Sequence, residues 1–424
     1  MAGADAVIAL LASAMVIAVP LVPGGESQAE AERVVAIRDV RILPVATPPI
    51  ERGVLLIRGD RIAGVGADVT IPPDAEVVDG AGLTAAPGFF DTYTGIGLIE
   101  VAGVPASNDS QEPGGVTPQL RAADAYFLDS ELIPLVRNAG TLVVLSVPGD
   151  RNVVAGQSAL MRTAGTTVEA AAVKEVAAVH ANLGEASKGG GFRTRMGAAA
   201  ALRQILQQAR GHAAREDAPP NHRLDPVVRV LRGELPLVVR AHRRDDILIA
   251  LRLSEEFGFR MILAGGADAP LVAAELAAWE VPVLVQPDLQ PSTMETAGVR
   301  YDNAAHLSRA GVRLAFQSNE TTLSRQLVPN IGLTVAYGLP YEEALKALTL
   351  YPAQIFGVDD MLGSLEVGKE ATFFLSRGDP LQVRTPVVSI YVKGRHYEPR
   401  SYQTRLCETF IAPVQESIPC QPTR

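Results

Sequence analysis

Cysteine, histidine and aromatic residues are scarce in this chain of 424 residues. It contains two cysteines, six histidines and one tryptophan, and aromatic residues make up 5% of it. Both cysteines, Cys407 and Cys420, lie near the C-terminus, which excludes a disulfide-rich scaffold and a zinc site built from clustered cysteines. In an oxidising compartment they would form one disulfide that closes a short loop, and otherwise they would remain two unpaired thiols.

The chain also lacks the basic surface that nucleic acid requires. Its 38 Lys and Arg against 47 Asp and Glu give a formal net charge of -9, and no basic stripe with interleaved aromatic residues is present. We therefore expect no nucleic-acid partner. The content of 47% hydrophobic and 20% charged residues is that of an ordinary globular protein, long enough for one large core and a smaller unit.

The N-terminus resembles a targeting segment. Residues 7–22 are almost wholly apolar, and Ala29-Glu30-Ala31 suits signal peptidase, so we expect a signal peptide over residues 1–31 and an exported, periplasmic protein. No Lys or Arg precedes Arg33, although signal peptides begin with positive charge, so a misplaced start codon and an uncleaved membrane anchor stay open as alternatives. Pro20 and the shortness of the run argue against the anchor.

Short β-runs flank the chain at both ends. Residues 53–66 read as a hairpin, and residues 371–375 and 387–392 read as two further strands. A long region of another character separates the two groups, so we expect them to pair into one small β-sandwich. The predicted sandwich comprises residues 32–85 and 364–400, and residues 401–424 form a C-terminal tail.

The central region, residues 86–363, alternates between short apolar runs and helical patterns. Runs that are apolar on both faces and alternate with helices predict an α/β protein with a covered parallel sheet. A (β/α)8 barrel and a doubly wound open sheet satisfy this pattern equally. The clearest runs are residues 141–147, 235–240, 259–264, 281–285 and 312–316.

Residues 86–97, Ala-Pro-Gly-Phe-Phe-Asp-Thr-Tyr-Thr-Gly-Ile-Gly, read as a buried strand that ends in a polar loop. This segment resembles the first metal motif of the amidohydrolase superfamily, in which Pro-Gly-apolar-apolar-Asp is followed by His-x-His. Tyr93 and Gly95 occupy the two histidine positions. The motif's frame is therefore present without its first two metal ligands.

The resemblance extends over nearly the whole chain that follows residue 31. Residues 118–125, 152–157 and 193–197 are similar to blocks of an imidazolonepropionase-like branch of the superfamily. Residues 342–349 with 352–357, followed by residues 363–371, resemble the last barrel helix and the return to the β-sandwich. The resemblance implies a TIM (β/α)8 barrel for the central region, with the small β-sandwich built from the N- and C-terminal segments.

Most metal-ligand positions of the family are replaced. His242 matches the histidine that ends a later strand and is the one ligand position retained. The next histidine position falls at Gly265, and the eighth-strand aspartate, the proton shuttle of the family, is Asn319, whose amide takes no proton. Arg162 stands where related chains have a lysine, and a guanidinium cannot form the metal-bridging carbamate that some members use.

Zinc requires about three protein ligands, so the sequence names no certain cofactor and leaves zinc or another divalent metal in doubt. An alternative metal site would recruit ligands from among His242, Asp91, Asp268 and Glu320. The residues expected to line the pocket are Asp91, Arg162, Asp268, Gln317 and Glu320. His180 and His306 lie in helical patterns, where packing or solvated roles are expected.

The resemblance leads to two functional hypotheses. In the first, the protein is a catalytically impaired homologue that binds a small amide- or ring-containing ligand, partners an active paralogue as a subunit, or forms a homo-oligomer. In the second, it is an active hydrolase of non-peptide C–N bonds with an altered or mononuclear metal site. We favour the first, because such chemistry needs an activated water or a nucleophile and the sequence shows neither clearly.

Overall fold

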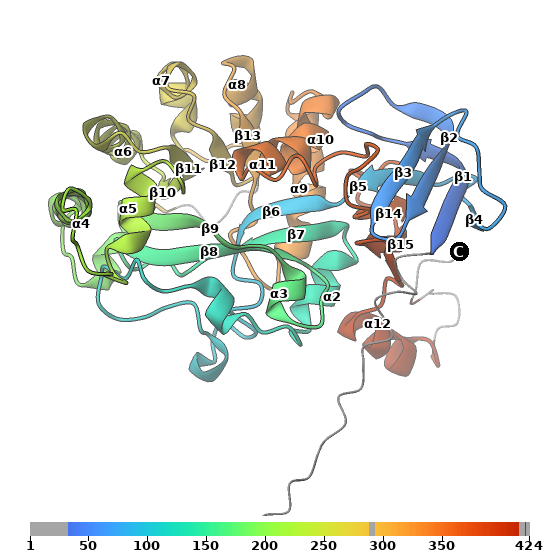
Figure 1. Cartoon of the computed structure of the whole chain (residues 1–424), viewed down its shortest axis with the longest axis horizontal. Helices are drawn as coiled ribbons and strands as arrows, with labels where there is room; N and C mark the ends of the chain where they lie inside the picture. Colours follow the sequence, from blue (N-terminus) through green and yellow to red (C-terminus); the bar gives the residue numbers. More distant parts are fainter. Residues whose placement is uncertain (1–32, 288–292, 415–419, 421–424) are drawn as a thin grey trace, which may run out of the picture.

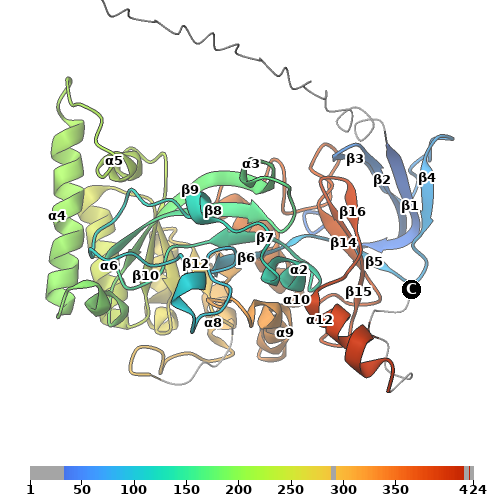
Figure 2. The same ribbon diagram turned by 90° about the horizontal axis from the view of Figure 1, so that it is seen from below.

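The computed structural model describes residues 33–287, 293–414 and 420, which form a barrel with a β-unit beside it (Figures 1 and 2). The predicted signal peptide over residues 1–31 lies outside these residues. Among the helices that the structure describes, none is long and apolar enough to cross a membrane.

The β-unit is built from both ends of the chain, as the sequence predicts, and its strands form one eight-stranded sheet. The strand order is β16-β15-β14-β5-β1-β2-β3, and β4 pairs with β1. The sheet curls so that its edge strand β3 approaches the segment before β14. There the Ile62 N–H donates to the Lys369 carbonyl (2.9 Å). The strands are β1 Val34–Ile42, β2 Ile50–Arg58, β3 Arg61–Gly66, β4 Glu76–Asp79, β5 Thr84–Pro87, β14 Phe373–Ser376, β15 Val387–Val392 and β16 Arg395–Tyr397.

Eight further strands form the barrel expected for the central region. The sheet order runs from β6 to β13 in sequence, and two hydrogen bonds close it: the Thr92 hydroxyl donates to the Phe316 carbonyl (2.8 Å), and the Asn319 N–H donates to the Tyr93 carbonyl (2.9 Å). The strands are β6 Phe89–Thr94, β7 Thr141–Ser146, β8 Val154–Arg162, β9 Ala172–Asn182, β10 Leu237–Ala241, β11 Met261–Gly265, β12 Val283–Val285 and β13 Leu314–Phe316.

One barrel strand departs from the all-parallel arrangement. β8 runs antiparallel to both β7 and β9. The connection from β7 to β8 spans only residues 147–153, and β8 reaches β9 through the four-residue helix α3, Val168–Ala171. A parallel crossover needs a dozen or more residues, so connections of this length force the chain to reverse direction.

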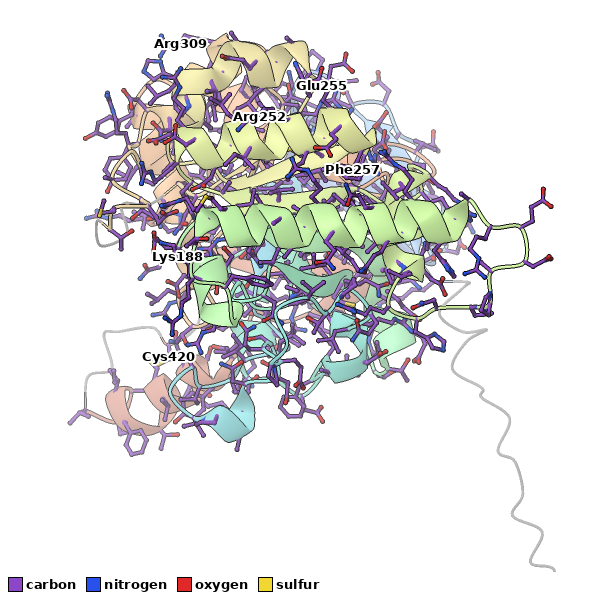
Figure 3. All side chains as sticks on the ribbon, turned by 90° about the vertical axis from the view of Figure 1, so that its left-hand side faces the viewer. Lys188, Arg252, Glu255, Phe257, Arg309 and Cys420 are labelled. Atoms are coloured by element: carbon purple, nitrogen blue, oxygen red, sulfur yellow. A yellow bond between two sulfur atoms is a disulfide. The ribbon has the colours of Figure 1, made fainter. Side chains whose placement is uncertain are left out.

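Helices cover the outside of the barrel (Figure 1). In α6, Arg244–Phe257, Ile247, Ala250 and Leu251 are buried at helical spacing, and Gly258 ends the helix in the left-handed region (φ 74°). Figure 3 shows α6 beside α4, with Arg252 and Glu255 on the outer side. The α-helices besides α3 and α6 are α2 Leu132–Arg137, α4 Arg195–Ala213, α5 Asp225–Leu231, α7 Ala273–Ala278, α8 Asn303–Arg309, α9 Leu327–Ala336, α10 Tyr341–Leu348, α11 Leu350–Ile355 and α12 Tyr402–Leu406.

The C-terminal tail carries the two cysteines. A π-helical turn, Cys407–Ile411, follows α12, and Cys407 is bonded to Cys420 with a Cα–Cα distance of 5.4 Å. Of the two states that the sequence leaves open, the structure therefore has the disulfide. Short 3-10 turns occur at Pro105–Ser107, Ala122–Ala125, Ala186–Gly190, Ala269–Val272 and Ser324–Gln326.

A buried ion pair joins the barrel to the β-unit. The Arg162 guanidinium, at the end of β8, donates to both carboxylate oxygens of Glu370 (2.6 and 2.9 Å), and the two side chains are 7% and 4% exposed. Arg162 also donates to the Ala172 carbonyl (2.7 Å), and Glu370 accepts from the Thr372 hydroxyl (2.6 Å). Each charge is thus paired and further hydrogen-bonded, which burial of an ion pair requires.

Removing one partner of this pair should destabilise the protein strongly. We expect Glu370→Met to lower the free energy of unfolding by about 3–5 kcal/mol, because it leaves an uncompensated buried guanidinium, whereas Arg162→Met combined with Glu370→Met recovers most of the loss. Urea unfolding measures both. The control is Glu76→Gln at the exposed pair with Arg33, where the expected change is below about 1 kcal/mol; a Glu370→Met effect as small as that would contradict the prediction.

Candidate functional site

The carboxyl ends of the parallel barrel strands carry a layer of polar side chains that point inward. Val238, Ile262, Leu284 and Ala315 belong to the apolar cluster inside the barrel. Since strand side chains alternate, the same inward face continues two residues later, at Arg240, and at Gln286 and Gln317 just past β12 and β13. We call the following residues the barrel-mouth site: Tyr93, His180, Asn182, Arg240, His242, Gln286 and Gln317.

Apart from Arg240, which is partly exposed, these side chains are buried, and all seven have polar atoms without a hydrogen-bond partner in the described part of the chain. Both ring nitrogens of His180 and His242 and both amide atoms of Gln317 are unpaired, and Gln317 is 0% exposed. The other unpaired atoms are Tyr93 Oη, Asn182 Oδ1, Arg240 Nε and Gln286 Nε2. An unsatisfied buried polar group costs about 1–3 kcal/mol, so a cluster of them indicates a functional site.

Burial keeps the titratable rings of the site neutral at pH 7. It lowers the pKa of His180 to about 3 and is the main cause that lowers the pKa of His242 to about 4, to which the Arg240 charge adds. It also raises the pKa of Tyr93 to about 12. The Tyr93 and His180 rings meet edge to face, with centroids 5.6 Å apart. The site therefore offers two neutral imidazoles and a phenol, which can each donate or accept a hydrogen bond.

One ion pair borders these neutral groups. The Arg240 guanidinium, with 12% of its side chain exposed, pairs with the Asp150 carboxylate. The charges of both residues act on the pKa of Tyr93 and on that of His242, so the four side chains lie within electrostatic reach of one another. The positive charge of Arg240 in the barrel-mouth site is thus offset by the Asp150 carboxylate.

Asp91 is held by the seam between β6 and β13. Its carboxylate accepts hydrogen bonds from the Ser318 N–H (2.9 Å) and the Ser318 hydroxyl (2.5 Å), and the residue is 1% exposed. Burial raises the pKa of Asp91 to about 7, although these hydrogen bonds lower it. The carboxylate serves to connect the first and last strands of the barrel.

Two positions where the family has histidine have no room for a side chain. A Cβ on Gly265 would lie 2.6 Å from His242 Cε1, and Gly265 has a φ of +86°. A Cβ on Gly95 would lie 2.8 Å from Thr321 Cγ2 and 2.9 Å from Ile99 Cδ1. Contacts of this length do not occur without rearrangement, so neighbouring side chains fill the space that these ligands would need.

The other predicted site residues have different surroundings. The Asp268 carboxylate accepts from the Arg244 N–H (3.0 Å) at the start of α6. Asn319 has a φ of 54° and is tied to Tyr93 through its backbone. The Glu320 carbonyl accepts from the hydroxyls of Thr94 (2.5 Å) and Ser324 (2.7 Å).

Arg162, expected to line the pocket, is not near it. Because β8 is antiparallel, its last residue pairs with Val143 near the start of β7, at the opposite end of the barrel from the barrel-mouth site. Of the predicted residues, the structure brings together Tyr93, His242 and Gln317. It adds His180, Asn182, Arg240 and Gln286, which sequence analysis missed.

The helical prediction for the sequence around His180 is wrong. The residue lies in β9 and is 1% exposed. The alanine-rich run before it is compatible with either period, but alternate residues from Ala178 through His180 to Asn182 continue one face of the strand. His306 does lie in a helix, α8.

The residues present do not fit a zinc site. Within residues 33–287 and 293–414, no group of three or more His, Cys, Asp or Glu side chains is placed to hold a metal ion, whereas zinc needs about three protein ligands. His180 and His242 are the two imidazoles of the barrel-mouth site. The nearby carboxylates of Asp91 and Asp150 are engaged by Ser318 and Arg240.

The family model, the curated relative and the first solved structure that resemble this chain are all described as amidohydrolases. The model of the amidohydrolase family matches residues 296–396. The amidohydrolase tasK of Hapsidospora irregularis is 22% identical over 372 residues, which are 76% of this chain and 37% of that protein. The chain thus spans little more than a third of the length of this curated relative.

Solved structures share the fold. An amidohydrolase from Thermotoga maritima MSB8 superimposes with a TM-score of 0.82 and 29% identity, over 86% of this chain and 100% of that one. A triazine hydrolase from Arthobacter aurescens has a TM-score of 0.52 and 15% identity, over 88% and 96% of the two chains. At that identity the second likeness concerns the fold alone.

The buried histidines should make the protein less stable in acid. In the unfolded chain histidine has a pKa of about 6.5, so below this pH the unfolded state binds protons that the folded state refuses until about pH 4 (His242) or about pH 3 (His180). The free energy of unfolding should fall by up to about 1.4 kcal/mol per pH unit for each histidine. We expect His242→Gln to flatten this slope in urea unfolding from pH 6.5 to 4.

Asp91 contributes in the opposite direction, since its raised pKa favours the folded state as the pH falls below about 7. This contribution is common to wild type and variant and cancels in their difference. The matched control is His306→Gln, at an exposed position on α8. A slope as steep in His242→Gln as in wild type would contradict the assignment.

Proposed function

Since the chain belongs to the amidohydrolase superfamily, we propose that it is a catalytically impaired homologue that binds a small neutral ligand in its barrel mouth. The observation that carries this proposal is the set of buried, unpaired polar atoms on the barrel-mouth site. They stand where the parallel strands of a barrel end, the usual place of active sites in this fold.

The chemistry of the lining suggests the class of ligand. The imidazoles of His180 and His242 and the phenol of Tyr93 are neutral at pH 7, and Gln286 and Gln317 add amides. The Arg240 charge is offset by Asp150. A neutral ligand with several donors and acceptors satisfies such a lining, whereas a charged ligand would lose its hydration without an opposite charge. We infer a small amide-containing or cyclic amide ligand.

The same residues argue against the ordinary metal-dependent hydrolysis. Activation of water by a metal requires an open site with about three protein ligands. Gly95 and Gly265 are closed by packing, and Asn319 offers an amide where the family has a proton-shuttling aspartate. Asp91, the remaining carboxylate of the first motif, is held by Ser318.

An active hydrolase with a mononuclear metal is the second candidate. One observation favours it: His180 and His242 are neutral and unpaired, which is the state in which imidazole binds metal. Two imidazoles would need at least one further ligand that moves into place.

Zinc binding separates the two candidates. We expect purified protein to contain no stoichiometric metal by elemental analysis and to show no tight site when titrated with zinc chloride, because two imidazoles fall short of about three ligands. His242→Ala and His180→Ala serve as comparisons, with His306→Ala as the control. One zinc per chain that is lost in both variants and kept in the control would favour the hydrolase.

Replacement of Gln317 tests the ligand site directly. Gln317→Met keeps the volume but removes two unpaired buried polar atoms, so we expect the ligand-free protein to gain about 1–2 kcal/mol in chemical unfolding. The same variant should lose the affinity for hydantoin or dihydrouracil, two cyclic amides, that we expect of wild type in calorimetric titration.

The control for this experiment is Gln382→Met, at an exposed position. It should change neither stability nor binding. A Gln317→Met protein that is less stable and binds as wild type would assign the residue a structural role. Failure of both cyclic amides to bind wild-type protein would contradict the ligand class.

We also propose, from the sequence, that the protein is exported and that it associates with another chain. The apolar run over residues 7–22 supports a periplasmic location. Association with an active paralogue, or with a second copy of the chain, would give an impaired homologue a regulatory role. Size-exclusion chromatography of the mature protein, alone and mixed with an active relative, examines both forms of association.

A further inference from the structure

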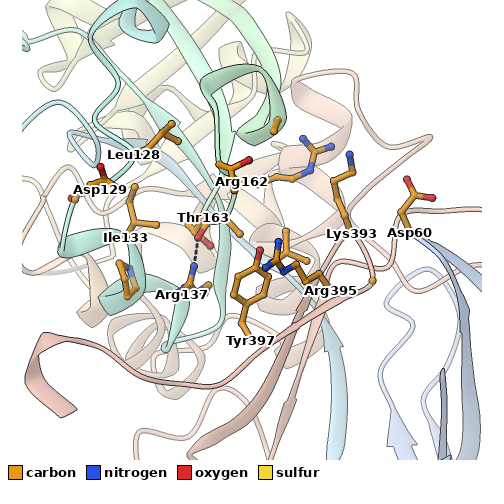
Figure 4. A pocket seen from close by; sticks show the side chains of 18 of the residues that line it. Asp60, Leu128, Asp129, Ile133, Arg137, Arg162, Thr163, Lys393, Arg395 and Tyr397 are labelled. Atoms are coloured by element: carbon orange, nitrogen blue, oxygen red, sulfur yellow. Dashed lines mark hydrogen bonds between the residues drawn. The ribbon is translucent and has the colours of Figure 1, made fainter. Parts of the chain in front are cut away.

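A cavity of about 910 Å³ lies between the barrel and the β-unit (Figure 4). Its walls include Arg162 and Thr163 at the end of β8 and Arg137 at the end of α2, together with Lys393, Arg395 and Tyr397 of the hairpin formed by β15 and β16. It therefore lies at the barrel end opposite the barrel-mouth site, and residues of that site do not contribute to it.

The lining of this cavity is strongly basic, although the whole chain carries a net charge of -9. Seven Arg and Lys side chains line it, against three Asp and Glu. Three of the cations have a carboxylate partner: Arg33 with Glu76, Arg162 with Glu370 and Arg405 with Glu131. Within the described chain, the other four, Arg58, Arg137, Lys393 and Arg395, form no salt bridge to a carboxylate. We call these four residues and Tyr397 the basic cleft.

Two of the guanidinium groups are held against one aromatic ring. Arg137 Cζ lies 4.8 Å and Arg395 Cζ 5.7 Å from the centroid of the Tyr397 ring, within the range of cation–π attraction. Arg137 donates to the Thr163 carbonyl (2.8 Å), as Figure 4 shows. The ring thus brings together two like charges that would otherwise repel each other.

Arg137 is a partly buried cation without a counterion. Its Nε is buried and has no partner in the described structure, and burial lowers the pKa of the guanidinium. Taking a charge out of water is unfavourable unless an opposite charge or hydrogen bonds offset it. A bound anion would supply both.

Backbone geometry positions the ammonium of the cleft. Lys393 has a φ of 51° in the turn between β15 and β16, and its N–H donates to the Thr372 hydroxyl (3.1 Å). The next residue must be glycine, because a Cβ on Gly394 would overlap the Gly59 carbonyl oxygen. The turn is therefore packed against the β2–β3 turn, and Lys393 stands at the edge of the cavity (Figure 4).

We propose that the basic cleft binds a small organic phosphate ester. Guanidinium groups donate forked hydrogen bonds to phosphate oxygens, and an ammonium adds a point charge. A phosphate ester carries up to two negative charges near neutral pH, which suits four uncompensated cations better than a single carboxylate. Tyr397, Leu128 and Ile133 line the same cavity and offer apolar surface to the organic part of the ligand.

Calorimetric titration of the full-length mature protein tests this site. The probes are inorganic phosphate, phenyl phosphate and citrate, at about 50 mM salt so that screening stays moderate. We expect one site per chain for phosphate, and tighter binding of phenyl phosphate because its ring adds apolar contact. Lys393→Gln combined with Arg395→Gln should weaken both by about tenfold or more, since it removes two charge-assisted contacts.

The matched control is Arg384→Gln, which removes an exposed positive charge from the β-unit outside the cavity. It should bind phosphate as wild type does, and thermal unfolding without ligand shows that each variant is folded. Gln317→Met should also keep phosphate binding, which separates this site from the barrel mouth. Equal affinities in wild type and the double variant, or no phosphate binding by wild type, would overturn the proposal; binding of citrate alone would refute the phosphate-ester class.

Discussion

Closure of the barrel between its first and last strands is the constraint on which the site depends. The seam is made by the Thr92 hydroxyl on the Phe316 carbonyl, the Asn319 N–H on the Tyr93 carbonyl, and the Asp91 carboxylate on Ser318. The last barrel strand, β13, has only three residues and leaves few backbone hydrogen bonds for this closure, so side chains contribute. In consequence a carboxylate of the first motif works as a structural clamp, and Tyr93 is turned toward the interior.

The two units divide the polar chemistry of the molecule. In the barrel-mouth site, burial keeps the two histidines neutral, as the lowered pKa values of His180 and His242 indicate, and the charge of Arg240 is offset by Asp150. At the junction with the β-unit, charge is retained and is either paired, as in Arg162 with Glu370, or exposed to the cavity, as in Lys393. One end of the barrel is therefore suited to neutral ligands and the other to anions.

Sequence patterns predicted the architecture well and the site only partly. Apolar runs on both faces predicted a covered α/β sheet, and the flanking β-segments predicted the terminal sheet, because burial of a strand is a local property of its residues. The choice of a barrel over an open sheet came from the family resemblance and not from the pattern. No strand was predicted over residues 154–162, where the structure has the antiparallel β8. Arg162 was therefore assigned to the pocket, whereas β8 carries it to the opposite end of the barrel. His180, Arg240 and Gln286 were missed because their role depends on two things that the sequence does not show. Their side chains must point into the barrel, and the barrel must close to bring their strands together.

Glycine at position 265 limits which substitutions could restore a metal ligand. His242 occupies the space that any side chain there would need, since its Cε1 lies 2.6 Å from the point where a Cβ would stand, and Thr321 and Ile99 similarly restrict Gly95. A substitution to histidine at position 265 would meet the His242 ring and would need a left-handed backbone conformation that non-glycine residues rarely adopt, so it would lower the stability of the fold. At position 95 the side-chain ends of Thr321 and Ile99 would have to move first. The proposed loss of the metal centre would therefore be hard to reverse. Restoring the metal ligands would require several coordinated substitutions, whereas further changes to the pocket could occur one at a time.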